Sequence, residues 1–208
     1  FESCRLNSKA IGMKKVEKLT LLAAALVAVA GCFNEPEPAY KSVPAENRVY
    51  LNDKGLKDVP QVNAKADYLN LDRNQLTNVD AVAALTGLKW LRLNDNRLSS
   101  LPDLKGLVSL RRIYLKNNRF DKVPETLKDL PALTDVELSG NPIKEIPDWL
   151  AQKPGLKNVS LSRTQIFKLP ADLSAWRTLQ SLQLGELRLT AEEMARIRKA
   201  LPKVAIVF

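Results

Sequence analysis

The sequence predicts an α/β solenoid, in which similar segments of chain stack and their strands form one parallel sheet. Three observations support this fold class. A nine-residue pattern, L-x-x-L-x-L-x-x-N, recurs along the chain, its copies from residue 66 onward start 22 or 23 residues apart, and its central residues alternate between apolar and polar. A single copy of this length cannot bury its own apolar side chains, so neighbouring copies must supply the core.

The clearest copy of the pattern reads LKWLRLNDN and occupies residues 88–96. Its x-L-x-L-x centre alternates with period two, which predicts a short strand with one buried face. A degenerate first copy at 46–54 keeps Val49 and Leu51 in the apolar slots. The remaining copies lie at residues 66–74, 110–118, 133–141, 156–164 and 179–187.

One polar residue type recurs at the end of the pattern. The same slot holds Asn74, Asn96, Asn118 and Asn141. An unsatisfied buried amide costs roughly 1–3 kcal/mol, so these side chains are expected to bond the loop backbone of adjacent turns. Thr164 and Leu187 replace the asparagine in later copies, and the loops there must be satisfied in another way.

The segments between the strands are short and return along the outside of the solenoid. Most of them begin with proline, which fits a single helical or 3-10 turn. They occupy residues 80–87, 102–109, 124–132, 147–155 and 170–178. Trp149 and Trp176 fall in these segments, where they are expected to pack between repeats rather than bind a ligand.

The end of the chain departs from the repeat. Thr190 and Glu193 have the spacing of a capping box and predict a helix over about residues 191–200. After Pro202, apolar residues alternate at Val204, Ile206 and Phe208 and predict a last strand. Residues 190–208 are therefore expected to cap the open end of a repeat domain that spans 46–208.

The pattern resembles the typical 22–24-residue class of leucine-rich repeats. The resemblance extends from Glu46 to the C-terminus and includes a Leu-Pro-like ending at residues 101–102, 123–124, 146–147 and 169–170. It implies a curved solenoid with a parallel sheet on its concave face and short helical or 3-10 turns outside. Many copies in register are specific for the fold, although they say little about function.

The first 31 residues have the features of a signal peptide. Residues 1–12 carry no pattern and are expected to be an upstream remnant, with Met13 as the natural start. Lys14, Lys15 and Lys18 precede an apolar run at 19–30. A run of about a dozen residues is short for a membrane-spanning helix, which needs ~20, but suits the apolar region of a signal peptide.

The end of this region, Val-Ala-Gly-Cys at residues 29–32, resembles the lipobox of bacterial lipoproteins. The resemblance implies cleavage before Cys32 and alkylation of its thiol by a diacylglyceryl group, with acyl chains as the membrane anchor. The alternative is an uncleaved apolar anchor that happens to contain a cysteine. In the lipoprotein interpretation, residues 32–45 comprise the lipidated Cys32 and a proline-rich tether. Phe33, rather than aspartate, favours the outer membrane over the inner membrane of a Gram-negative cell.

Composition excludes several kinds of site from the repeats. The chain has no histidine, and its two cysteines, Cys4 and Cys32, both precede the repeats. A Cys2His2 zinc site, a disulfide framework and a thiol nucleophile are therefore excluded from the repeat domain, and no cofactor or metal is expected. The net charge of +9, of which residues 1–31 contribute +3, permits attraction to acidic surfaces without establishing it.

The side chains between the strand leucines are expected to face outward on the concave face. Their residue types are uneven along the sheet. The first half carries aromatic and arginine side chains, and the middle carries acids: Tyr50, Tyr68, Trp90, Arg92, Arg112 and Tyr114, then Asp135 and Glu137. Aromatic and arginine side chains that no core requires are typical of protein-binding hot spots. The alternative is a solvated sheet whose side chains only pack across strands.

Two other uses of this face are disfavoured. The expected face carries six basic and six acidic residues, whereas a groove that binds nucleic acid would carry predominantly positive charge. Asp135 and Glu137 lie two apart on one strand, so their carboxyls can approach ~6–7 Å, near the range of a hydrolase pair. An open, solvated sheet does not exclude water or separate their pKa values, and no phosphate-binding loop or nucleophile motif is present. The chain is therefore predicted not to be an enzyme.

These observations predict a lipid-anchored protein of the bacterial cell envelope with a non-catalytic protein-binding face. The resemblance to bacterial surface proteins implies a host protein or a neighbouring envelope protein as the partner. A structural envelope scaffold is the alternative, and a glycan or peptidoglycan binder that uses Trp90 and the tyrosines is a further one.

Overall fold

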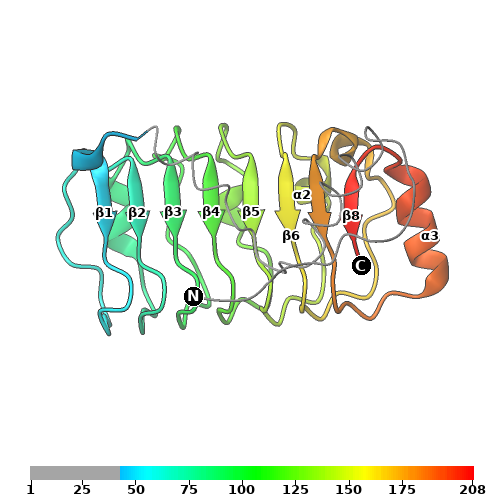
Figure 1. Ribbon diagram of the computed structural model, residues 1–208, viewed down its shortest axis with the longest axis horizontal. Helices are drawn as coiled ribbons and strands as arrows, with labels where there is room; N and C mark the ends of the chain where they lie inside the picture. Colours follow the sequence, from blue (N-terminus) through cyan, green and yellow to red (C-terminus); the bar gives the residue numbers. More distant parts are fainter. Residues whose placement is uncertain (1–42) are drawn as a thin grey trace, which may run out of the picture. The chain divides into compact units, whose positions relative to one another are not determined.

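The computed structural model describes residues 43–208, and these residues hold one eight-stranded sheet. Each strand is three residues long, and successive strands along the chain lie next to one another (Figure 1). The strands are β1 (Arg48–Tyr50), β2 (Tyr68–Asn70), β3 (Trp90–Arg92), β4 (Arg112–Tyr114), β5 (Asp135–Glu137), β6 (Asn158–Ser160), β7 (Ser181–Gln183) and β8 (Ala205–Val207).

All neighbouring strands pair in parallel and without a shift of register. The central residue of each strand is paired with the central residue of the next, as Leu69 is with Leu91 and Leu91 with Ile113. From β2 to β7 these central side chains are buried in the core. The solenoid expected from the sequence is therefore confirmed, with each x-L-x-L-x segment forming one strand.

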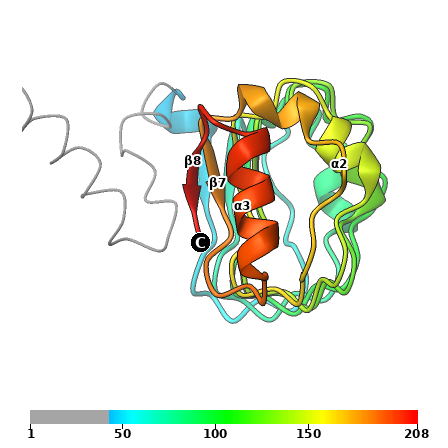
Figure 2. The same cartoon turned by 90° about the vertical axis from the view of Figure 1, so that its right-hand side faces the viewer.

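The returning segments carry short helices on the side of the core away from the sheet (Figure 2). Pro124 and Pro147 are the N-caps of two of them. The helices on returning segments are η3 (Asp80–Ala84), η4 (Glu125–Leu127), α2 (Asp148–Gln152) and η5 (Ser174–Thr178). The 3-10 helix η2 (Ala45–Asn47) instead precedes β1, and the α-helix α3 (Ala191–Ala200) lies in the C-terminal segment.

One of these segments differs from the expectation. Residues 102–109 form turns and no helix. The Asp103 carboxylate accepts a hydrogen bond from the backbone N–H of Lys105 at 3.0 Å. Leu104 and Leu107 are fully buried and hold the segment to the core. The same kind of bond from Ser174 N–H to Asp172 precedes a 3-10 helix, so this bond alone does not explain the absence of a helix here.

The core between the sheet and the outer segments is continuous from repeat to repeat. It consists mainly of leucines with no exposed surface, and the largest fully buried side chain is Trp176. The indole N–H of Trp176 donates to the carbonyl oxygen of Leu150 at 2.9 Å. Trp149 is half-buried and donates to the Glu125 carboxylate at 3.0 Å. Both tryptophans therefore pack between repeats.

The asparagines at the end of each pattern form a ladder along the loops. The Asn118 amide donates to the carbonyl oxygens of Leu93 at 2.9 Å and Leu115 at 3.0 Å, and accepts from the backbone N–H of Leu98 at 3.0 Å. Each bond to Leu93 or Leu98 reaches back one repeat. Equivalent bonds are made by Asn74, Asn96 and Asn141.

The ladder ends at Asn141. Thr164 occupies the next slot, and its hydroxyl donates to Leu161 O within its own repeat at 2.8 Å. Leu187 occupies the slot after that and packs its side chain partly buried against the core. The last two repeats are therefore joined to the rest without a side-chain amide at this position.

The C-terminal segment closes the sheet and the core. The backbone N–H of Glu193 donates to the hydroxyl of the N-cap residue Thr190 at 3.1 Å, which is one half of a capping box. The Glu193 carboxylate instead accepts from the backbone N–H of Leu169 at 2.9 Å and from Arg196. Strand β8 pairs with β7, and Ile197 on α3 is fully buried against the core. Among residues 43–208, none of the helices has the length and apolar character needed to cross a membrane.

Candidate functional site

The face of the sheet that points away from the leucine core, called the concave face here, is built by the first and third residues of each strand. Parallel pairing in register places these residues in two rows across the sheet. The first row is Arg48, Tyr68, Trp90, Arg112, Asp135, Asn158 and Ser181. The third-residue row is Tyr50, Asn70, Arg92, Tyr114, Glu137, Ser160 and Gln183.

The aromatic side chains at the start of this face pack against one another. The rings of Tyr50 and Tyr68 have centroids 5.4 Å apart, and Tyr50 is 50% exposed. Tyr68 and Trp90 form a small buried cluster with Val43, which precedes the first repeat. Arg48 donates from Nε and Nη2 to the carbonyl oxygen of Val43. The chain therefore enters the repeats across the concave face, and part of the expected aromatic patch is covered by Val43.

The two arginines of the patch are held by neighbouring strands. The Arg92 guanidinium lies 5.0 Å from the centre of the Tyr114 ring, and its Nε donates to the Asp72 carboxylate at 2.8 Å. The Arg112 guanidinium lies 5.9 Å from the centre of the Trp90 ring. Cations over aromatic faces are attracted by the ring quadrupole. These contacts hold large side chains in fixed positions on the face.

The two acidic residues in the middle of the face have different surroundings. Asp135 accepts hydrogen bonds from the Thr134 hydroxyl and, at 2.6 Å, from the Asn158 amide, and lies 3.6 Å from Arg112. Glu137 is only 4% exposed, and its carboxylate accepts from the backbone N–H of Ser139 at 2.8 Å. Burial raises the pKa of Glu137, and the hydrogen bond from Ser139 opposes this rise.

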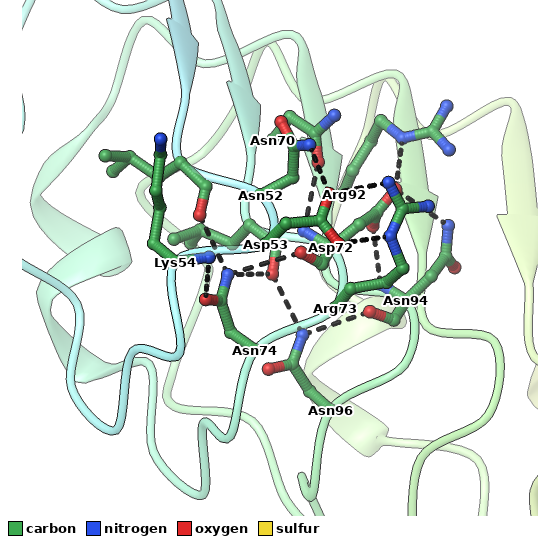
Figure 3. A network of polar contacts seen from close by, with 12 residues as sticks. Asn52, Asp53, Lys54, Asn70, Asp72, Arg73, Asn74, Arg92, Asn94 and Asn96 are labelled. Atoms are coloured by element: carbon green, nitrogen blue, oxygen red, sulfur yellow. Dashed lines mark hydrogen bonds and ion pairs between the residues drawn. The ribbon is translucent and has the colours of Figure 1, made fainter.

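A polar network continues from the concave face into the loops after β1–β3 (Figure 3). The buried Asp72 carboxylate accepts from Arg92 and, at 2.7 Å, from the backbone N–H of Asn94. Burial raises the pKa of Asp72, and Arg92 opposes this rise. At the exposed edge, the hydrogen bond from Arg73 lowers the pKa of Asp53 to about 2.

The sequence pattern did not predict that Asp72 and Asn94 join adjacent loops. The signal was present in the spacing, since the two residues occupy the same pattern position in consecutive copies. The residue that follows this position has a positive φ in every repeat, close to 55° at Arg73 and Asp95 and 70° at Gly140. The loops are therefore sharply turned and similar from copy to copy.

A second surface feature lies on the loops after β5–β7. A hollow of about 860 Å³ is lined there by Lys144, Arg163, Thr164, Gln165, Phe167, Glu186 and Arg188. The Phe167 side chain is 63% exposed. No sequence pattern pointed directly to this hollow. It lies where Thr164 and Leu187 replace the ladder asparagine, and that departure from the pattern was the available signal.

Two further predictions concern metals and lipidation. Among residues 43–208, no group of three or more histidine, cysteine or acidic side chains is placed to hold a metal ion. Cys32, the predicted lipidation site, lies outside the described residues, as do the predicted signal peptide at 1–31 and most of the tether at 32–45.

Comparisons with known proteins identify the repeat. Residues 64–120 and 86–143 match the family model described as leucine rich repeat. A leucine-rich repeat protein of Leptospira interrogans is 30% identical, with a TM-score of 0.63 over 70% of this chain and 38% of that chain. An internalin of Listeria monocytogenes is 23% identical, with a TM-score of 0.59 over 70% of this chain and 45% of that chain.

The chain thus spans less than half the length of either protein, and the likeness to the internalin concerns the fold alone. No curated protein sequence matches the chain. The family model covers the central repeats, and the parallel strands of the sheet continue in register on both sides of the matched residues. The described part of the chain therefore has the leucine-rich repeat fold.

Proposed function

We propose that this protein is a non-catalytic protein-binding module that uses the concave face around Tyr50, Arg92 and Tyr114. The observation that carries the proposal is the row of aromatic and arginine side chains held in register by cross-strand contacts. Side chains that are already fixed lose little conformational entropy when a partner binds. Aromatic and arginine residues are also the types that most often dominate binding energy.

The surroundings of the two acidic residues support a binding role over a catalytic one. Asp135 is engaged by Thr134, Asn158 and Arg112, and Glu137 is buried with Ser139. In the described part of the chain, neither carboxylate belongs to a group of side chains that could hold a metal ion. The proposal for this face is therefore recognition without chemistry.

A photo-crosslinking amino acid at position 50 tests the binding role. Benzoylphenylalanine replaces Tyr50, which is 50% exposed on the concave face, and in a matched variant replaces Val108, which is 58% exposed on an outer segment. In cells of the source organism, irradiation should give a discrete crosslinked species from position 50 and none from position 108. Equal crosslinking from both positions, or none from position 50, would contradict the proposal.

The proposal includes export to the bacterial envelope and a lipid anchor at Cys32, with the outer membrane favoured in a Gram-negative cell. It rests on the basic and apolar leader and the lipobox-like residues 29–32. Cell fractionation should place the wild-type protein with membranes and the Cys32→Ser variant among soluble proteins. Protease added to intact cells should degrade the repeats if they face outward, in which case a host protein is the favoured partner. Protection until lysis would favour an envelope partner.

A further inference from the structure

A hollow lies at the edge of the sheet where the strands begin, at one end of the concave face. Its volume is about 490 Å³. The first residues of β3 to β6 contribute to its lining, together with the residues directly before β4 and β6. Those that matter for its chemistry are Trp90, Arg111, Arg112, Asp135, Lys157 and Asn158.

The indole of Trp90 gives this hollow an unusual donor. Trp90 is 7% exposed, and its Nε1 is buried without a hydrogen-bond partner among the described residues. An indole N–H can only donate, and a buried donor is ordinarily paired. The other two indoles of the described chain are paired, since Trp149 donates to Glu125 and Trp176 to Leu150. Trp90, which lines the hollow, therefore carries an N–H donor that is not used within the described chain.

The charges around the hollow select the kind of acceptor. Arg112 pairs with Asp135, whose carboxylate also accepts from Asn158. Arg111 and Lys157 are exposed at the same edge, and no acidic residue of the lining balances them. The lining therefore carries three cations and one anion, an excess of two positive charges. An ionised carboxylate accepts hydrogen bonds through both oxygens and matches this combination of donors.

We propose that this hollow binds an acidic side chain of an extended protein segment, with the carboxylate accepting from Trp90 Nε1 and attracted by Arg111 and Lys157. The inference rests on the proposed protein-binding role of the concave face and names the chemistry of the partner. Parallel strands stand ~4.8 Å apart, so the three spacings from β3 to β6 span roughly 14 Å, the reach of about four extended residues. On the same strands, outside the lining of the hollow, Arg92 stacks over the Tyr114 ring, which is itself only 4% exposed.

The indole N–H signals of the ¹⁵N-labelled chain provide a direct test. The probe is an eight-residue polyglutamate peptide, and the signals are assigned with Trp90→Phe and Trp149→Phe variants. The Trp90 proton should move downfield and saturate as the peptide is added, while the Trp149 and Trp176 signals stay in place. An unchanged Trp90 signal, or equal and unsaturated movement of all three signals, would overturn the inference.

Matched charge variants separate a specific site from general attraction. The Arg111→Gln and Lys157→Gln double variant should weaken peptide binding at least ten-fold. A double variant with Lys122→Gln and Lys203→Gln removes the same charge from exposed positions outside this lining and should change the affinity less than two-fold. Equal weakening by the two double variants would overturn the inference.

An octamer of galacturonate, an acidic glycan of the same charge, distinguishes the source of the carboxylate. It should bind at least ten-fold more weakly than the peptide. Equal or tighter binding of the glycan would overturn the assignment to a protein segment. Failure of the peptide titration leaves crosslinking at position 50 as a separate test, so this inference and the proposed function can fail independently.

Discussion

Replacing Asn118 by alanine removes three buried hydrogen bonds at once and tests whether the asparagine ladder holds the repeats together. The amide donates to Leu93 O and Leu115 O and accepts from Leu98 N–H. Asn118 is 7% exposed, so water has little access to the groups that lose their partner. Two of the three partners, Leu93 and Leu98, belong to the preceding repeat, and Leu115 belongs to the repeat of Asn118 itself.

The expected magnitude follows from these bonds. A net hydrogen bond contributes about 1 kcal/mol, and a buried group left without its partner costs about 1–3 kcal/mol. The Leu93 carbonyl retains a bond from Asn96, and the Leu115 carbonyl retains one from Asn141, which limits the loss at both carbonyl oxygens. The N–H of Leu98 is left without its acceptor. Together these effects predict a loss of about 3 kcal/mol in the free energy of unfolding.

Urea unfolding followed by circular dichroism and by tryptophan fluorescence measures this loss. Asn78→Ala is the matched control, because Asn78 also bonds its neighbour Asp80 through both amide atoms but is exposed, so water can replace its partners. The control should cost less than about 1 kcal/mol. A loss below about 1 kcal/mol for Asn118→Ala, with both probes reporting one transition, would refute the reasoning.

Three further predictions concern stability. Thr164→Asn should raise the free energy of unfolding by about 1 kcal/mol in the same urea assay, since it extends the ladder by one repeat. Glu137→Gln should be more stable than wild type at pH 7 and should lose this advantage toward about pH 4.5. Because the pKa of Glu137 is raised in the folded state, the wild-type protein is most stable below the usual pKa of 4.5 and loses stability as the pH rises through the folded-state pKa. Melting temperatures of both proteins across this pH range measure the difference. Gly140→Ala should lower the melting temperature, because φ is +70° and the added Cβ would lie 2.1 Å from Asn117 Oδ1.

The results that would contradict these predictions are distinct. An unchanged or lower stability of Thr164→Asn would mean that the loop after β5 cannot present its backbone to an amide at position 164. A pH-independent difference between Glu137→Gln and wild type would mean that Glu137 titrates normally in the folded protein. A stable Gly140→Ala variant would mean that Asn117 can rotate away at little cost.

The strands could be predicted residue by residue because the period fixes their register. Leu91, Ile113 and Val136 occupy the same slot in successive copies, and each is the central residue of its strand. The outer segments were less predictable. Residues 102–109 form turns, whereas the segment in which Ser174 N–H makes the same kind of bond to Asp172 carries a 3-10 helix. The apolar pattern of the repeat does not separate these two outcomes.

The concave face was predictable in position but not in exposure. The pattern placed Tyr68 and Trp90 on this face, where both are buried with Val43. That contact comes from a residue ahead of the repeats and has no periodic signal. The burial of Glu137 and the bonds of Asp135 depend on side chains in neighbouring strands, which a single copy of the pattern does not specify.

The end of the asparagine ladder at Asn141 divides the solenoid into two blocks of unequal coupling. In a linear array, each repeat is stabilised by its contacts with the next, so the weakest junction sets where cooperativity breaks. The block after Asn141 should open first, and its amide protons should exchange earlier than those of β2–β4 in native-state hydrogen exchange. Because the hollow around Phe167 spans this junction, a molecule bound there would contact both blocks and delay the opening of the second block.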